Sequence, residues 1–138
     1  MKLNNKSGFT LLEIIIVIII VGILASLALP RFFSTVEYSK STEAFAGMTA
    51  LRQSMERCYL QAGGNYTACT LAGLDVENPQ NSPGAHFTYA IAGQGLTGYA
   101  ITGTRNTSDG GDGTSTITLT QTSKGVTRAG TGKYAGVR

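Results

Sequence analysis

The sequence has no tryptophan, one histidine and two cysteines among its 138 residues, and only 14% of its residues are charged. Metal centres and catalytic sites usually draw on clusters of His, Cys, Asp and Glu at recognisable spacings. No such cluster and no pairing of a nucleophile with a base stands out here. We therefore expect no enzymatic activity, no cofactor and no metal site.

A surplus of basic residues is also nearly absent once the first residues are set aside. The formal net charge is +3, but Lys2 and Lys6 both precede Gly8, and from Phe9 onward nine Lys/Arg face eight Asp/Glu. Binding to phosphate backbones usually shows as a clustered basic face. The sequence therefore makes no specific nucleic-acid site evident.

A long apolar run is present near the start of the chain. Residues 9–29 are 21 residues in which Glu13 is the only charge. A helix of this length spans roughly 30 Å, which matches the hydrocarbon core of a bilayer. Because Lys2 and Lys6 precede the run, the positive-inside rule places the N-terminus in the cytoplasm and the rest of the chain outside.

Three interpretations of this run compete, and Glu13 separates them. A secretory signal peptide would be cut after the apolar region, for which Ser26-Leu27-Ala28 offers small residues. A plain membrane anchor would not be cut, and a third kind of leader is removed before the apolar run. An acidic residue inside a membrane span costs about 2.5–3.5 kcal/mol, less near the interface. Neither a signal peptide nor an anchor has a use for it, which favours the third interpretation.

The string GFTLLEIIIVIIIVGILASLALP resembles the N-terminal pattern of type IV pilin precursors and of type II secretion pseudopilins, with a short basic leader as in the type a pilins. The resemblance implies that prepilin peptidase cuts between Gly8 and Phe9 and that the new Phe9 amine is N-methylated. It assigns Glu13 to assembly, where the carboxylate pairs with the Phe9 amine of a neighbouring subunit. Gly22 and Pro30 match the helix-weakening positions of the family.

The function that the resemblance implies is that of a structural subunit of an extracellular type IV pilus, used for attachment, twitching motility or DNA uptake. The expected partners are other copies of the chain, prepilin peptidase, the pilus assembly machinery and, before assembly, the inner membrane. One alternative is a type II secretion or competence pseudopilin in a periplasmic fibre. Another, of a different class, is a membrane-anchored or secreted β-domain that binds a ligand.

Helical periodicity resumes after Pro30, where we expect a kink or a local break. Apolar residues recur at steps of three and four from Ala44 to Ala62, and Gly63-Gly64 offers a stop. The sequence thus predicts a helix over residues 9–62, apolar all round in its first half and amphipathic in its second. Arg52 and Glu56, four residues apart, are expected to pair weakly.

Cys58 and Cys69 are eleven positions apart, a spacing that matches no zinc or redox motif. An external location favours a disulfide between them over two free thiols. No cysteine follows Cys69, so a disulfide-bounded loop near the C-terminus, as in many pilins, is not expected.

Alternating residues predict strands over residues 86–92, 96–104 and 114–122, and a fourth strand is expected near residues 126–134. Residues 93–95 offer a short hairpin turn. The expected fold is α+β: a long N-terminal helix whose amphipathic half packs on a three- or four-stranded antiparallel sheet, with a threonine-rich outer face. We expect a leader over residues 1–8, an apolar membrane or filament-core helix over 9–30, and a globular domain over 31–138.

Lesser motifs add little. Asp109 and Asp112 lie in a glycine-rich loop, but two carboxylates cannot fill a calcium site of six to eight ligands. Glycosylation triplets begin at Asn65 and Asn106, and such triplets are common by chance. His86 is expected to be a strand-edge residue without a chemical role.

Overall fold

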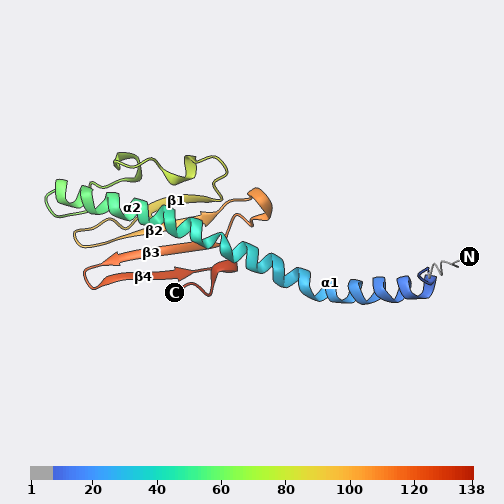
Figure 1. The fold of residues 1–138 in the computed structure, drawn as a ribbon. Helices are drawn as coiled ribbons and strands as arrows, with labels where there is room; N and C mark the ends of the chain where they lie inside the picture. The colour runs from blue at the N-terminus through green and yellow to red at the C-terminus, as the bar shows by residue number, and fades with distance from the viewer. Residues whose placement is uncertain (1–7) are drawn as a thin grey trace, which may run out of the picture. The chain divides into compact units, whose positions relative to one another are not determined.

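The computed structural model describes residues 8–138, which fall into two compact units (Figure 1). The first unit ends at Val36, and the second is Glu37–Arg138. Two long helices come first: α1 is Leu11–Ser39 and α2 is Ser41–Gln61. The strands are β1 (Phe87–Ala92), β2 (Tyr99–Arg105), β3 (Thr116–Thr122) and β4 (Gly125–Gly130). Four short 3-10 turns lie between and after them: η1 (Leu71–Gly73), η2 (Pro79–Asn81), η3 (Ser108–Gly110) and η4 (Gly132–Tyr134).

Helix α1 is not broken at Pro30. The helix continues through Gly22 and Pro30 as far as Ser39, and Lys40 alone separates it from α2. The break expected at Pro30 is therefore wrong, whereas a kink there stays a prediction. Isoleucine and valine dominate the first half of α1, and these residues are poor helix formers in water. In a lipid or protein environment without water the helix is nonetheless favoured, because it pairs every backbone group internally.

Helix α2 carries the single apolar stripe that its sequence predicts. Ala44, Met48, Leu51 and Met55 are fully buried on this stripe. They pack against inward-facing residues of the sheet to form one hydrophobic core, whose larger sheet members are Phe87, Tyr89, Tyr99, Ile101, Ile117 and Leu119. The amphipathic half of the predicted helix is thus confirmed.

The sheet is a four-stranded antiparallel meander in the order β1-β2-β3-β4 (Figure 1). The pilin-like α+β fold is therefore confirmed, including the fourth strand, which ends at Gly130 and gives way to η4. One detail differs: β1 and β2 are joined by residues 93–98, a longer connection than the turn expected over 93–95.

On the outward face of the sheet, every paired strand position holds threonine or alanine except Gly125 at the start of β4. These residues are Thr88, Ala90, Ala92, Ala100, Thr102, Thr104, Thr116, Thr118, Thr120, Thr122, Thr127 and Ala129. The charged strand residues Arg105 and Arg128 lie on the other face, the one that α2 covers. A threonine-rich, uncharged outer face is what the alternation predicts.

Gly47 on α2 is required by close packing against β1. A Cβ atom at this position would overlap the hydroxyl group of Tyr89. The Tyr89 hydroxyl also lies 3.5 Å from the Glu43 carbonyl oxygen, to which it donates. Burial raises the pKa of Tyr89 to about 12, and the Glu43 charge adds to the effect. Glycine weakens a helix interior by about 1 kcal/mol, and here it lets the helix approach the strand.

Candidate functional site

The first unit exposes its apolar side chains. In residues 8–36 no residue is buried, and Phe9 and Leu11 are 85% and 80% exposed. The helical stretch Leu11–Gln61 begins with α1. Part of this stretch is long and apolar enough to cross a membrane, judged by length and composition alone. Large exposed apolar surfaces mark contacts with membranes or other proteins. The apolar run from Phe9 to Leu29 within this region is called the assembly segment below.

Glu13 has a local partner at the start of the assembly segment. Its Oε2 atom accepts hydrogen bonds from the backbone N–H and the hydroxyl group of Thr10, both at 2.8 Å. The Thr10 hydroxyl oxygen in turn accepts from the Glu13 backbone N–H at 3.3 Å. This reciprocal arrangement is a capping box, in which two polar side chains satisfy backbone groups at a helix start. The Thr-x-x-Glu pattern would have revealed it in the sequence.

Gly8 and Phe9 lie outside the helix, just before its first turn. Both are exposed, and a Cβ added at Gly8 would have no neighbour within 4 Å. An accessible, non-helical bond is what a peptidase needs. Cleavage at this bond, methylation of Phe9 and pairing of Glu13 with another copy stay predictions. The basic residues Lys2 and Lys6 lie outside the described residues.

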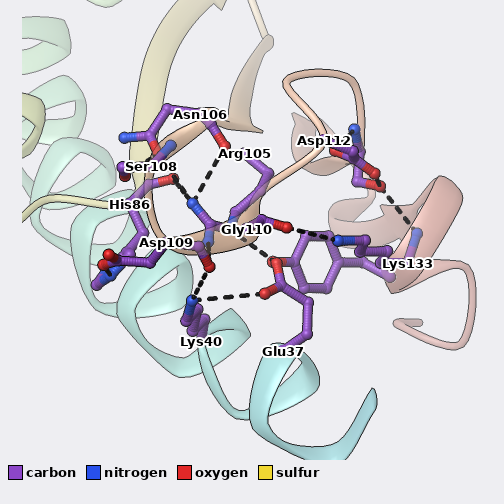
Figure 2. A network of polar contacts seen from close by, with 12 residues as sticks. Glu37, Lys40, His86, Arg105, Asn106, Ser108, Asp109, Gly110, Asp112 and Lys133 are labelled. Carbon is purple, nitrogen blue, oxygen red and sulfur yellow. Dashed lines mark hydrogen bonds and ion pairs between the residues drawn. The ribbon is translucent and has the colours of Figure 1, made fainter. Parts of the chain in front are cut away.

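A buried ion pair holds the last turn of α1 to the sheet. The Arg105 guanidinium donates from Nε to Glu37 Oε1 at 2.7 Å (Figure 2). The Tyr134 hydroxyl donates to the same oxygen at 2.9 Å. Arg105 is fully buried, and the Glu37 side chain is 12% exposed. Burial raises the pKa of Glu37, but the hydrogen bonds from Arg105 and Tyr134 outweigh it, so the pKa lies below its usual value.

The same guanidinium orders the loop between β2 and β3. Its Nη1 atom donates to the carbonyl oxygens of His86 and Asn106, and its Nη2 atom donates to the Asp109 carbonyl oxygen at 3.4 Å. Lys40 adds a bond from Nζ to the Asp109 carbonyl oxygen at 3.2 Å and an ion pair with Glu37 at 3.5 Å (Figure 2). The single residue between the two helices is thus tied to this loop.

His86 has more contacts than the sequence suggests. Its two ring nitrogens lie 2.7 Å from Glu43 Oε2 and 2.8 Å from Asp109 Oδ2. The imidazole therefore links α2 to the loop between β2 and β3. His86 lies directly before β1, at the strand edge as expected, and it also forms a structural bridge that the sequence did not predict.

The buried network around Arg105 is not predicted by the local sequence patterns. Arg105 gave a signal, because it continues the inward-facing alternation of Tyr99, Ile101 and Gly103. A charged side chain at an inward position of a strand predicts a buried partner. Glu37 and Tyr134 are 97 residues apart in sequence, and no local pattern connects them.

Cys58 and Cys69 form the expected disulfide, with a Cα–Cα distance of 5.9 Å. The bridge fastens the end of α2 to the following loop. Tyr66 within this loop donates to Glu56 Oε2 at 3.0 Å, and Tyr99 donates to Glu56 Oε1 at 3.3 Å. Burial and the Glu56 carboxylate raise the pKa of Tyr66 to about 12. The weak pair expected between Arg52 and Glu56 is not formed: the carboxylate binds the two tyrosines instead.

The acidic loop uses its carboxylates internally. Asp112 accepts hydrogen bonds from the Thr114 and Ser115 backbone N–H groups and from the Ser115 hydroxyl. These bonds hold the pKa of Asp112 well below its usual value. Among the described residues, no group of three or more His, Cys, Asp and Glu is placed to hold a metal ion.

Comparison with known proteins places this arrangement in a family. Residues 3–29 match the model of the prokaryotic N-terminal methylation motif. The type IV major alpha-pilin of Moraxella bovis is 32% identical over 123 residues, which cover 85% of this chain and 70% of the relative. The chain belongs to the type IV pilin and pseudopilin family. Members of this family are structural subunits and not enzymes. Membership of the family implies polymerisation and prepilin processing.

Other relatives of this chain include both type IV pilins and type II secretion proteins. The type II secretion system core protein G of Aeromonas hydrophila is 36% identical over 85 residues, 60% of this chain and 58% of the relative. The fimbrial protein of Moraxella nonliquefaciens is 38% identical over 80 residues, 54% of this chain and 49% of the relative. The chain thus spans about half the length of these two relatives. Pilins and pseudopilins match it at similar identity.

Proposed function

We propose that this pilin-family chain is the structural subunit of an extracellular type IV pilus. The observation that carries the proposal is Glu13, the single charge in the exposed apolar run of residues 9–29. In a filament, the assembly segments of many copies pack together and bury this surface. Removing apolar surface from water contributes about 25 cal/mol per Å², which makes the packed state strongly favourable.

Glu13 gives such a bundle its register. Cleavage between Gly8 and Phe9 frees an amine four residues before Glu13, just outside the first turn of α1. In an apolar interior an unpaired charge is costly, so a copy docked out of register is penalised. The carboxylate exchanges its bonds to Thr10 for a bond to the amine of a neighbouring copy.

Before assembly the chain resides in the inner membrane, with its N-terminus in the cytoplasm and its globular unit outside. The apolar stretch of α1 supports the span, and Lys2 and Lys6 support the orientation. Prepilin peptidase and the pilus assembly machinery then act on it. Attachment, twitching motility and DNA uptake are the operations that such a filament serves.

A type II secretion or competence pseudopilin is the second candidate, favoured by the identity to the core protein G of Aeromonas hydrophila. The longer alignment with the Moraxella bovis pilin, 123 residues against 85, supports the pilus. Electron microscopy of material sheared from cells distinguishes the two: surface filaments that contain this chain support the pilus, and filaments confined to the periplasm support the pseudopilus.

Mass spectrometry of the mature chain tests the processing step. The proposal expects a chain that begins with N-methylated Phe9. A chain that begins at Leu29 would indicate an ordinary signal peptide, and an intact Met1 would indicate a plain anchor for a ligand-binding β-domain. Either result would overturn the proposal.

A further inference from the structure

The His86 imidazole lies between two carboxylates that come from separate parts of the fold. Its Nδ1 atom lies 2.7 Å from Glu43 Oε2 on α2, and its Nε2 atom lies 2.8 Å from Asp109 Oδ2 in the loop between β2 and β3. An ionised carboxylate only accepts hydrogen bonds, and a neutral imidazole has one N–H group to donate. Both contacts are therefore hydrogen bonds only when these three side chains hold one proton more than a neutral ring and two carboxylates.

The imidazole is the group that takes up this proton. Aspartate and glutamate side chains ordinarily titrate at about pH 4, whereas histidine ordinarily titrates at about pH 6.5. As the imidazolium, the ring donates from both nitrogens, one to Glu43 and one to Asp109. His86 is the single histidine of the chain, and histidine is the side chain whose charge ordinarily changes between about pH 5 and 8. The contact between α2 and the loop thus depends on one proton that is exchanged in this range.

Three cations surround this bridge, and they bond backbone atoms. They donate to carbonyl oxygens (Figure 2): Arg105 Nη1 to His86 at 3.2 Å, Lys40 Nζ to Asp109 at 3.2 Å, and Lys133 Nζ to Gly110 at 3.1 Å. Glu37 pairs with two of them, Arg105 and Lys40. The other carboxylate of the loop, Asp112, accepts from Ser115. Within the described part of the chain, the charged groups bonded to the ring are therefore the two carboxylates.

Asp109 is the weaker end of the bridge. Glu43, in the first turn of α2, also accepts from the His86 backbone N–H at 2.7 Å through Oε1. The Asp109 side chain is 72% exposed, against 39% for Glu43. Asp109 is also the one non-glycine residue with a positive φ, 48°, among the described residues, a conformation that L-residues adopt at a cost. When the ring loses its proton, the bond to Asp109 is therefore the one that is lost.

The loop that Asp109 belongs to covers the Arg105 guanidinium. We call residues 106–113 the latch loop. A Cβ atom built at Gly111 would lie 2.7 Å from the Cζ and Nη1 atoms of Arg105, so the backbone of the latch loop packs directly on the guanidinium. Arg105 Nη2 also donates to the Asp109 carbonyl oxygen at 3.4 Å, and the Arg105 side chain has no exposure to solvent. The latch loop thus helps to keep water from the Arg105–Glu37 ion pair.

We propose that His86 is a pH-sensitive switch, whose imidazolium holds the latch loop closed over the Arg105–Glu37 ion pair and whose deprotonation lets the loop open. On opening, the Nε2–H proton passes to water and the Asp109 carboxylate stays ionised. Because closing takes up a proton that opening releases, the open loop gains population as the pH rises. The loop is then held by longer bonds, such as those that its carbonyl oxygens accept from Lys40 and Lys133.

The switch acts in the opposite sense to Glu37. The Glu37 carboxylate has to be ionised to pair with Arg105, and its pKa lies below the usual value of 4.5. The imidazole, in contrast, has to be protonated to hold the latch loop. The closed loop and the ionised pair therefore coexist between the two titrations. A chain outside the cytoplasm meets the pH of its surroundings, which this end of the globular unit then senses; that consequence, unlike the switch itself, rests on the proposed location.

Amide hydrogen exchange of the detergent-solubilised full chain tests the switch. Mass spectrometry compares the latch loop at about pH 5.5 and about pH 8, on either side of the ordinary histidine titration, with rates corrected for the intrinsic effect of pH. We expect protection of the latch loop to fall at least roughly tenfold at the higher pH, because a hydrogen bond to a charged group is lost. Protection of α2 should stay unchanged. The ¹⁵N spectrum of the single histidine should show both ring nitrogens protonated at the lower pH and Nδ1 alone at the higher.

Three variants assign the pH dependence. His86→Phe removes the bridge, so the latch loop should be poorly protected at both pH values. Asp109→Asn should keep it closed at both, because a carboxamide accepts from a ring N–H and donates to a bare ring nitrogen, and asparagine tolerates the left-handed backbone. Lys133→Ala is the matched control: it removes a bond to the latch loop that does not titrate in this range. It should lower protection by the same factor at both pH values.

Equal protection of the wild-type latch loop at the two pH values would overturn the proposal, as would a neutral imidazole at about pH 5.5. A His86→Phe variant that keeps the pH dependence, or an Asp109→Asn variant that opens at the higher pH like the wild type, would also overturn it. Circular dichroism shows whether each variant is folded. If His86→Phe does not fold, the comparison of Asp109→Asn with the wild type decides.

Discussion

The Arg105 guanidinium lies 2.7 Å from the Glu37 carboxylate, and its side chain has no exposure to solvent. The pair joins the last turn of α1 to the end of β2, 68 positions further along the chain. A buried charge without its partner is expensive. The ion pair therefore fixes the last turn of α1 against the end of β2.

Replacing Arg105 with alanine is expected to destabilise the globular unit by about 3–5 kcal/mol, because the largely buried Glu37 would lose its hydrogen-bonded partner and keep only the longer ion pair with Lys40 at 3.5 Å. Chemical denaturation of the detergent-solubilised chain measures this change. Arg57→Ala is the matched control, because the Arg57–Asp75 pair is about half exposed, and exposed ion pairs contribute little to stability. Equal losses for the two variants would contradict the account.

The stability of the globular unit is expected to fall with acid. The pKa of Glu37 is lowered in the folded chain from 4.5. A carboxyl group with a lowered pKa binds fewer protons when folded, so its contribution is present above the unfolded pKa and is lost as pH falls through the folded pKa. The free energy of unfolding should therefore decline below about pH 4.5, and Glu37→Gln should flatten the decline. An unchanged slope in that variant would contradict the role given to Glu37.

Loss of the disulfide is expected to destabilise the chain without changing the fold. Closing a loop of this length constrains the unfolded chain by about 2.5–3 kcal/mol. The double variant Cys58→Ser and Cys69→Ser should lose about this much in denaturant, while its circular dichroism spectrum stays native. Addition of a reductant should affect the wild type alone. A wild type insensitive to reductant and as stable as the variant would show that the bond contributes nothing.

Gly47→Ala is expected to destabilise the globular unit, although alanine is the better helix former. The added methyl group overlaps the Tyr89 hydroxyl, and overpacking costs typically about 1–3 kcal/mol. Gln53→Ala, at an exposed position of the same helix, is the control and is expected to change stability by less than about 0.5 kcal/mol. A Gly47→Ala variant more stable than the wild type would mean that the Tyr89 side chain can move away from the added methyl group without a loss of stability.

Much of the fold follows from local pattern. The stripe from Ala44 to Met55 and the alternation around Ile101 and Ile117 are single-element signals, and each corresponds to a buried face in the structure. The disulfide was predictable because a location outside the cytoplasm favours oxidised cysteines. Pro30 does not end the helix as expected, because a proline can lie inside a helix when the environment favours the helix strongly enough.

The polar network could not be predicted, for a physical reason. Glu37, Arg105 and Tyr134 lie on three separate segments, and only the packed sheet brings them together. Glu13 is an intermediate case, since its capping box with Thr10 is a local signal.

That capping box gives Glu13 a second role within one copy, so a test of Glu13 in assembly has to separate the two roles. Glu13→Ala removes both the cap and the proposed pairing with a neighbouring Phe9 amine, whereas Thr10→Val removes the side-chain cap and keeps the carboxylate. The decisive measurement is the filament yield of these two variants, by electron microscopy of sheared material from cells in which the chain is processed to Phe9. We expect Glu13→Ala to lose filaments and Thr10→Val to keep them. Normal filaments from Glu13→Ala, or equal loss from both variants, would contradict it.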